Sequence, residues 1–143
     1  AISESEMEKE FIKQTEWPEK LSYPNIIKAS GALLNLFDEG FIRGITATAP
    51  GFYGPQGRRL RMPLAYPDLN ERLQKFNYEG KKVLNFEMET SGLYGLGRSL
   101  GHNALTVCAV IANRIRKEYS QDHQQTIQQL IEIVLSKLAQ IDD

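Results

Sequence analysis

The spacing of apolar and polar positions divides the first part of the chain into two helices and a strand. The charged opening has helix-capping spacings and few apolar anchors, which predicts a short exposed helix over residues 3–14. The proline-punctuated stretch 17–24 predicts a loop. Apolar residues on a helical period then predict a helix over 24–40 that Gly40 ends. The β-branched segment 41–49 follows directly and predicts a strand.

The second half of the chain predicts a strand–helix–strand unit. A helix around 67–76 comes before VLNFEME, 83–89, which has the pattern of a strand. Small residues open a helix over 91–101, and the nearly continuous apolar run ALTVCAVIA, 104–112, is typical of a buried strand. The strands 83–89 and 104–112 are therefore expected to form a buried parallel pair, because a helical crossover joins them.

A last amphipathic helix is predicted over residues 120–140, with Ser120 or Asp122 as its N-cap. Its apolar face comprises Ile127, Leu130, Ile131, Val134, Leu135 and Leu138. The alternation of helices and strands predicts an α/β fold, with layers in the order α/β/α around a mixed, largely parallel central sheet. Residues 1–25 are expected to form a peripheral N-terminal helix and loop, and residues 26–143 the main body of the domain.

Composition narrows the possible partners. The chain has 143 residues, 41% of them hydrophobic and 24% charged, as expected for one folded domain. Its net charge of -1 implies no attraction to nucleic acid or to an anionic membrane, which favours a small substrate or a protein partner. The single cysteine, Cys108, suits a reducing compartment, so the cytoplasm is expected. His102 and His123 lack partners at ligand spacing, and no metal site is predicted.

Candidate ligand-binding side chains follow the predicted strand 41–49. Ligands in parallel sheets collect at the carboxyl ends of strands, and the loop GFYGPQGRRLR, 51–61, begins at such an end. Phe52 offers a face for stacking, Gln56 a planar acceptor and donor pair, and Arg58 a fixed fork of donors. Together they fit a planar amide-bearing ring such as uracil. The alternative is a turn built by glycine and proline whose polar residues are merely solvated.

The other two strand ends also carry charged groups. Glu87 and Glu89 stand two residues apart at the end of 83–89, where a sugar diol could satisfy one carboxylate. The alternative is an exposed edge whose acids pair with Lys81, Lys82 or an arginine. The apolar strand 104–112 leads into Asn113 and Arg114. Each signal is weak alone, but convergence of the three ends at one sheet edge would make a binding site.

These motifs resemble those of a known family. GITATAPGFYGPQGR, followed by NFEMETSGLYGLGRSLGHNALTVCAVIANR, is similar to the nucleoside phosphorylase superfamily and, within it, to the uridine phosphorylases. The likeness covers about residues 26–138. The family's domain is much longer than this chain, and its phosphate-binding residues lie in an N-terminal half not found here. Residues 26–143 therefore look like the C-terminal half of a phosphorylase domain.

The resemblance implies a role for each matching residue. Phe52 would pack on the base, while Gln56 and Arg58 would hydrogen-bond the edge of uracil. Arg114 would support the base pocket. The ribose-binding residues would be Glu87, Met88 and Glu89, with Glu89 accepting from the sugar hydroxyls; Gln56, Arg58 and Glu89 would carry catalysis. Purine-specific relatives usually have an aspartate in the segment that here reads VIANR, which favours a pyrimidine nucleoside.

The implied reaction is phosphorolysis of a uridine-like nucleoside to free base and ribose 1-phosphate. Inorganic phosphate would be a co-substrate, with no metal or other cofactor. The expected partners are the nucleoside, phosphate and further protein chains, in a homo-oligomer or with a companion N-terminal chain. This chain by itself is expected to be inactive. The alternatives are a nucleosidase of the same superfamily, which uses water in place of phosphate, and a noncatalytic nucleoside-binding or assembly module.

Overall fold

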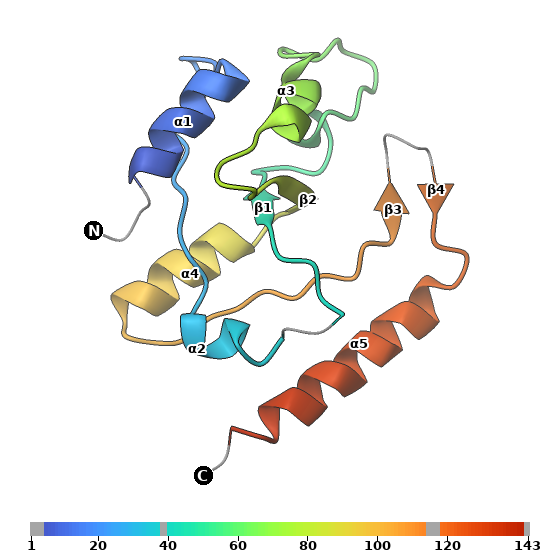
Figure 1. The fold of residues 1–143 in the computed structure, drawn as a ribbon. Coiled ribbons are helices and arrows are strands. Elements are labelled where there is room, and N and C mark those ends of the chain that lie inside the picture. The colour runs from blue at the N-terminus through green and yellow to red at the C-terminus, as the bar shows by residue number, and fades with distance from the viewer. Residues whose placement is uncertain (1–4, 38–39, 114–117, 142–143) are drawn as a thin grey trace.

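The chain forms a mixed α/β fold with a small parallel sheet and several helices, which confirms the predicted fold class (Figure 1). The structure is a computed structural model that describes residues 5–37, 40–113 and 118–141. β1 (Ile45–Thr48) and β2 (Val83–Glu87) pair in parallel, and the helix α3 (Leu69–Lys75) lies between them in the sequence. The observed parallel crossover unit is thus β1–α3–β2. None of the described helices is long and apolar enough to cross a membrane.

The core lies between the N-terminal helix α1 (Ser5–Thr15), α3 and the sheet. Its buried side chains are Met7, Phe11, Leu73 and Phe76. The rings of Phe11 and Phe76 meet edge to face, with centroids 5.0 Å apart. The prediction of an exposed N-terminal helix is therefore wrong, because Met7 and Phe11 lie on one buried face of α1. The predicted boundary at residue 25 stays a prediction.

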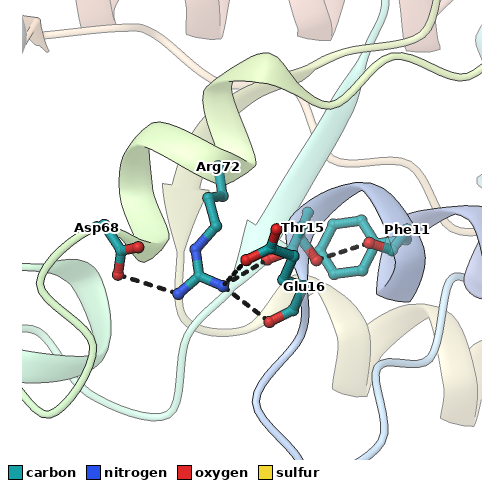
Figure 2. A network of polar contacts seen from close by, with 5 residues as sticks. All are labelled: Phe11, Thr15, Glu16, Asp68 and Arg72. Carbon is teal, nitrogen blue, oxygen red and sulfur yellow. Dashed lines mark hydrogen bonds and ion pairs between the residues drawn. The ribbon is translucent and has the colours of Figure 1, made fainter.

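A single arginine joins the end of α1 to α3, as Figure 2 shows. Nη1 of Arg72 donates to the backbone carbonyl oxygens of Thr15, at 3.0 Å, and Glu16, at 2.8 Å. Its Nη2 donates to Oδ1 of Asp68 at 3.0 Å. The hydroxyl of Thr15 donates in turn to the carbonyl of Phe11 at 2.6 Å. Arg72 thus satisfies carbonyls that the end of a helix leaves without partners in the helix.

The helix predicted over residues 24–40 is much shorter than expected. Of the residues described in this range, only α2 (Gly31–Leu34) is helical, with Ser30 as its N-cap. The chain before it is held in another conformation, because the backbone N–H of Ile26 donates to the carboxylate of Glu8 at 2.7 Å. Glu8 is itself buried in α1. A tertiary hydrogen bond therefore overrides the helical spacing of the apolar residues.

The strand predicted over residues 104–112 is also wrong for most of its length. Residues 104–111 have no regular secondary structure, and only β3 (Ala112–Asn113) pairs, antiparallel, with β4 (Glu118–Tyr119). The carbonyl of Ala104 accepts from the backbone N–H of Ser30 at 2.9 Å, so this end of the segment bonds to an irregular stretch. A strand needs a ladder along a neighbouring strand, and the apolar run does not obtain one here.

The last two predicted helices are present. α4 (Thr90–Ser99) follows β2 and contacts β1, and the chain leaves it through Gly101 at φ +77°. α5 (His123–Leu138) begins after Asp122, whose side chain accepts from the backbone N–H of Gln125 at 3.0 Å. The N-cap alternative at Asp122 is thereby confirmed. None of the described residues of α5 is buried, and of its predicted apolar face only Leu130 and Val134 are partly covered by this chain.

Candidate functional site

Two of the three predicted site segments come together at the carboxyl end of the sheet. Thr48, the last residue of β1, stands opposite Glu87, the last residue of β2. The backbone N–H of Ala49 donates to the Glu87 carbonyl at 2.9 Å, which extends the pairing one residue further. The loop 51–58 follows the end of β1 at this edge. Met88 and Glu89 follow the end of β2 at the same edge. The third segment does not join them as a strand end, and Arg114 lies outside the described residues.

The loop after β1 is a compact turn. It contains one short 3-10 helix, η1 (Gly54–Gln56), with a proline in its first turn. Gln56 is buried, at 3% exposure, and the chain turns away from it through Gly57 at φ +76°. The backbone N–H of Arg58 donates back to the carbonyl of Tyr53 at 2.9 Å. The turn therefore fixes the backbone on either side of Gln56 and Arg58.

Arg58 joins three of the four predicted base-binding side chains, Phe52, Gln56 and Arg58 itself, in one cluster. Its Nη1 donates to Oε1 of Gln56 at 2.8 Å and also to the backbone carbonyl of Phe52. Its guanidinium carbon lies 3.4 Å from the centroid of the Phe52 ring, a close cation–π contact. A planar ligand that stacks on this face of Phe52 must therefore displace Arg58 from the ring. Arg58 would then be free to donate to the ligand's edge.

Glu87 has a defined place at the junction of β2 and α4. Its Oε2 accepts from the backbone N–H groups of Glu89, at 2.7 Å, and Thr90, at 2.6 Å. Its Oε1 accepts from the hydroxyl of Thr48. Burial is the largest single influence and raises the pKa of Glu87, but the hydrogen bonds from Thr48, Glu89 and Thr90 together lower it below its ordinary value. The carboxylate thus stays charged at the positive end of α4.

Met88 and Glu89 are more exposed than Glu87. β2 ends at Glu87, and Glu89 is the N-cap residue of α4, so the two carboxylates do not share one face of a continued strand. Oε2 of Glu89 accepts from the backbone N–H of Met88 at 3.2 Å. The alternative pairing of these acids with Lys81 is not what the structure shows, because Lys81 pairs with Glu79 at 3.6 Å.

The irregular segment 104–111 passes beside the end of β2. The pKa of the Cys108 thiol is raised above its ordinary value, mainly by partial burial. A hydrogen bond with Asn85 opposes this shift, and the negative charge of Glu87 adds to it. In addition, the hydroxyls of Thr90 and Thr106 lie 2.9 Å apart. The segment therefore follows the course of a neighbouring strand without forming a ladder.

A large open hollow borders this edge of the sheet. Its volume is about 2510 Å³, and Arg58, Met88 and Thr48 line it together with apolar side chains of the segment 104–110 and of α5. Sites for small ligands usually occupy about 300–1,000 Å³, so this hollow is too large to be one. Among the described residues, no three His, Cys, Asp or Glu side chains gather closely enough to hold a metal ion.

Sequence reasoning missed two residues that organise the site. Thr48 donates to Glu87, and its Oγ1 also accepts from the backbone N–H of Ser91 at 2.9 Å, which joins the end of β1 to the start of α4. Asn70 of α3 donates through Nδ2 to the backbone carbonyl of Gln56 at 3.1 Å. Thr48 lies at the end of a predicted strand, and this position could have marked it as a site residue. Nothing in the spacing of Asn70 linked it to the loop.

Comparisons with known proteins agree on one family. The model of the phosphorylase superfamily matches residues 6–141. The uridine phosphorylase of Thermococcus kodakarensis is 33% identical over 71% of this chain and 38% of its own length. A DeoD-type purine nucleoside phosphorylase of Bacillus thuringiensis is 30% identical over 85% of this chain and 50% of its own length. A DeoD-type enzyme of Proteus mirabilis is 31% identical over 54% of this chain and 31% of its own length.

The matched relatives are longer than the part they share with this chain. The chain spans about half of their length or less. No solved structure gives a significant match. The names of these relatives include both a pyrimidine and a purine substrate class, so the base must be argued from the residues of this chain.

Proposed function

Because this chain belongs to the phosphorylase superfamily, we propose that it carries the base and ribose contacts of a nucleoside phosphorylase that acts on a uridine-like pyrimidine nucleoside. The cluster of Arg58 with Gln56 and Phe52 is the observation that carries the proposal. It combines a fork of donors, an amide and an aromatic face within one turn. These are the groups that a planar ring with alternating carbonyl and N–H groups requires.

The proposed reaction cleaves the bond between the base and the anomeric carbon. A phosphate oxygen forms the new bond to that carbon, and the electron pair of the broken bond leaves with the base, so that the products are ribose 1-phosphate and free base. Arg58 and Gln56 stabilise the negative charge that develops on the departing uracil. Glu89 accepts from the ribose hydroxyls beside Met88, and Arg114 supports the base from the segment after β3.

The pyrimidine assignment depends on two features of the sequence. An acid is needed to protonate a purine as it leaves, and VIANR, residues 110–114, contains none. The amide of Gln56 and the guanidinium of Arg58 instead offer neutral and cationic donors. A leaving uracil anion is stabilised by such donors without being protonated.

Base binding provides the direct test. We expect the 143-residue chain to bind uracil more tightly than adenine, as measured by ligand-observed NMR titration. Arg58→Ala should weaken uracil binding by about tenfold or more, since a hydrogen bond to a charged group contributes roughly 1.5–3 kcal/mol. Arg59→Ala is the matched control, because it removes an exposed arginine next in the chain. Tighter binding of adenine, or equal effects of the two variants, would contradict the proposal.

Turnover separates the proposal from its rivals. We expect the chain alone to release no uracil from uridine in phosphate buffer, because its candidate site residues are proposed to contact the base and the ribose and none of them the phosphate. Release together with ribose 1-phosphate would show a complete phosphorylase site. Release of free ribose would show a nucleosidase, and base binding with no turnover in any assembly would favour a noncatalytic module.

A further inference from the structure

The side chain of Asn70 links the helix α3 to the predicted base-binding turn. Asn70, in its first turn, donates through Nδ2 to the backbone carbonyl of Gln56 at 3.1 Å. Gln56 is buried, at 3% exposure, so this carbonyl has little access to water as an alternative partner. A buried acceptor that loses its partner costs roughly 1–3 kcal/mol. The bond from Asn70 therefore contributes to holding the turn.

Gly57, the next residue in the turn, packs closely against the side chain of Asn70. A Cβ atom added to Gly57 would lie 2.1 Å from Nδ2 and 2.8 Å from Cγ of Asn70. The amide of Asn70 thus packs directly against the Cα of Gly57. Gly57 also has a φ of +76°, which L side chains rarely adopt. The hydrogen bond and the close packing both fix the point where the chain turns from Gln56 to Arg58.

The other end of α3 is anchored to the core. Arg72, two residues after Asn70, donates to the carbonyls at the end of α1 (Figure 2). Leu73 is buried among the core side chains. Asn70 therefore stands on a helix whose own position is fixed. Through it, the anchored helix bonds to a turn in which the backbone N–H groups of Gln56 and Arg58 donate to the carbonyl of Tyr53.

We propose that Asn70 is a positioning residue, which holds the Gln56–Gly57 turn so that the side chains of Gln56 and Arg58 face a bound base. The expected effect of Asn70 on ligand binding rests on the proposed function. Its effect on the conformation of the turn does not. Asn70 touches no substrate in this role. It acts through the backbone of the residues that do.

The test compares Asn70→Ala and Asn70→Asp with the unmodified chain. The aspartate variant keeps the shape of the side chain but replaces the donor with an acceptor that faces the Gln56 carbonyl. The control is Gln74→Ala, which removes an exposed amide from the same helix. Amide hydrogen exchange by NMR reports on the turn, through the N–H groups of Gln56, Gly57 and Arg58. Titration with uracil reports on the site.

Both Asn70 variants should speed exchange of the three turn amides by about tenfold, the effect of losing one hydrogen bond. Exchange at Phe76, in the core, should not change. Uracil should bind about tenfold more weakly, and Gln74→Ala should behave as the unmodified chain. If Asn70→Ala does not fold, the isosteric Asn70→Asp supplies the result.

Unchanged exchange of the turn amides in the Asn70 variants would overturn the proposal. So would faster exchange with unaltered uracil affinity, because the turn's position would then not matter for the base. If even the unmodified chain binds no uracil, the proposed function fails. Faster exchange confined to the turn would in that case still support the role of Asn70 in holding it.

Discussion

At the scale of single residues, Glu87 shows how one side chain can serve both the fold and the site. It is among the residues predicted to bind ribose, and in the structure its two oxygens accept hydrogen bonds from the end of β1 and the start of α4. Glu89, the other carboxylate predicted to bind ribose, is more exposed. Glu87 therefore fixes the junction from which Glu89 extends.

The lowered pKa of Glu87 predicts a dependence of stability on pH. A carboxyl group whose pKa is lower in the folded state stabilises the fold fully above its unfolded pKa, and this contribution is lost as the pH falls through the folded pKa. Glu87→Gln should therefore reduce the free energy of unfolding at neutral pH by about 1 kcal/mol, a magnitude typical of an anion at a helix N-terminus. In acid, below the lowered pKa, the difference from the unmodified chain should disappear.

Urea unfolding at a series of pH values measures this difference. Glu19→Gln is the control, because Glu19 is an exposed carboxylate in the loop after α1. It should change stability little at any pH. A constant difference between Glu87→Gln and the unmodified chain across the acid range would show that the charge of Glu87 does not stabilise the fold.

Residue chemistry was the part of the site most readable in the sequence. The types and order of Phe52, Gln56 and Arg58 predicted a cluster, and the structure brings Phe52 and Gln56 into contact with Arg58. That the cluster binds a planar base stays a prediction. Asn70 could not be predicted in this way. Asn70 lies on α3 and Gln56 in the loop after β1, so their contact forms only when α3 packs beside that loop.

At the scale of elements, the hydrogen bonds of Arg72 join α1 to α3 beside the apolar contacts of the core. Arg72 alone donates to two carbonyls at the end of α1 and to Asp68 of its own helix region (Figure 2). The guanidinium can do this because its donors form a rigid planar fork. A lysine would keep the charge but could not reach all three acceptors with fixed geometry.

We therefore expect Arg72→Lys to lower the free energy of unfolding by about 1–2 kcal/mol, because it leaves helix-end carbonyls without a good partner. Urea denaturation measures the change. The control is Lys75→Arg, the reverse exchange at an exposed position of the same helix. Equal stability of Arg72→Lys and the unmodified chain would mean that the joint contributes nothing to folding.

Element predictions succeeded where the local pattern and the packing agreed. α3, α4 and α5 form close to where their apolar spacing and capping residues placed them. The helix over 24–40 and the strand over 104–112 failed because their backbone groups bond to partners far away in the sequence, such as Glu8. A local pattern cannot report a competing partner of this kind.

At the scale of the whole molecule, much apolar surface stays uncovered. Leu93 and Leu96 of α4 and its C-cap residue Leu100 make an exposed stripe, and Leu130 and Ile133 of α5 border the large hollow beside the sheet. Contiguous apolar patches of this kind usually mark surfaces that contact another protein. The oligomer predicted from the sequence fits such a surface and remains a proposal.

We expect the purified chain to self-associate, with native mass spectrometry showing multiples of 16.2 kDa. Leu96→Glu should shift the distribution toward the single chain, because a charged side chain in the stripe opposes burial. Arg98→Gln, which alters the charge of the same helix by the same amount, should leave it unchanged. A single chain at all concentrations would contradict this prediction.

The sequence by itself determined the family, the α/β class and the chemistry of the candidate base-binding loop. These depend on residue types and their local order, which a chain displays without folding. The tertiary structure decided which strands pair, that α1 belongs to the core, and that Asn70 and Thr48 organise the site. Such features depend on which distant groups satisfy each other's hydrogen bonds and cover each other's apolar surface, and only the assembled fold fixes those pairings.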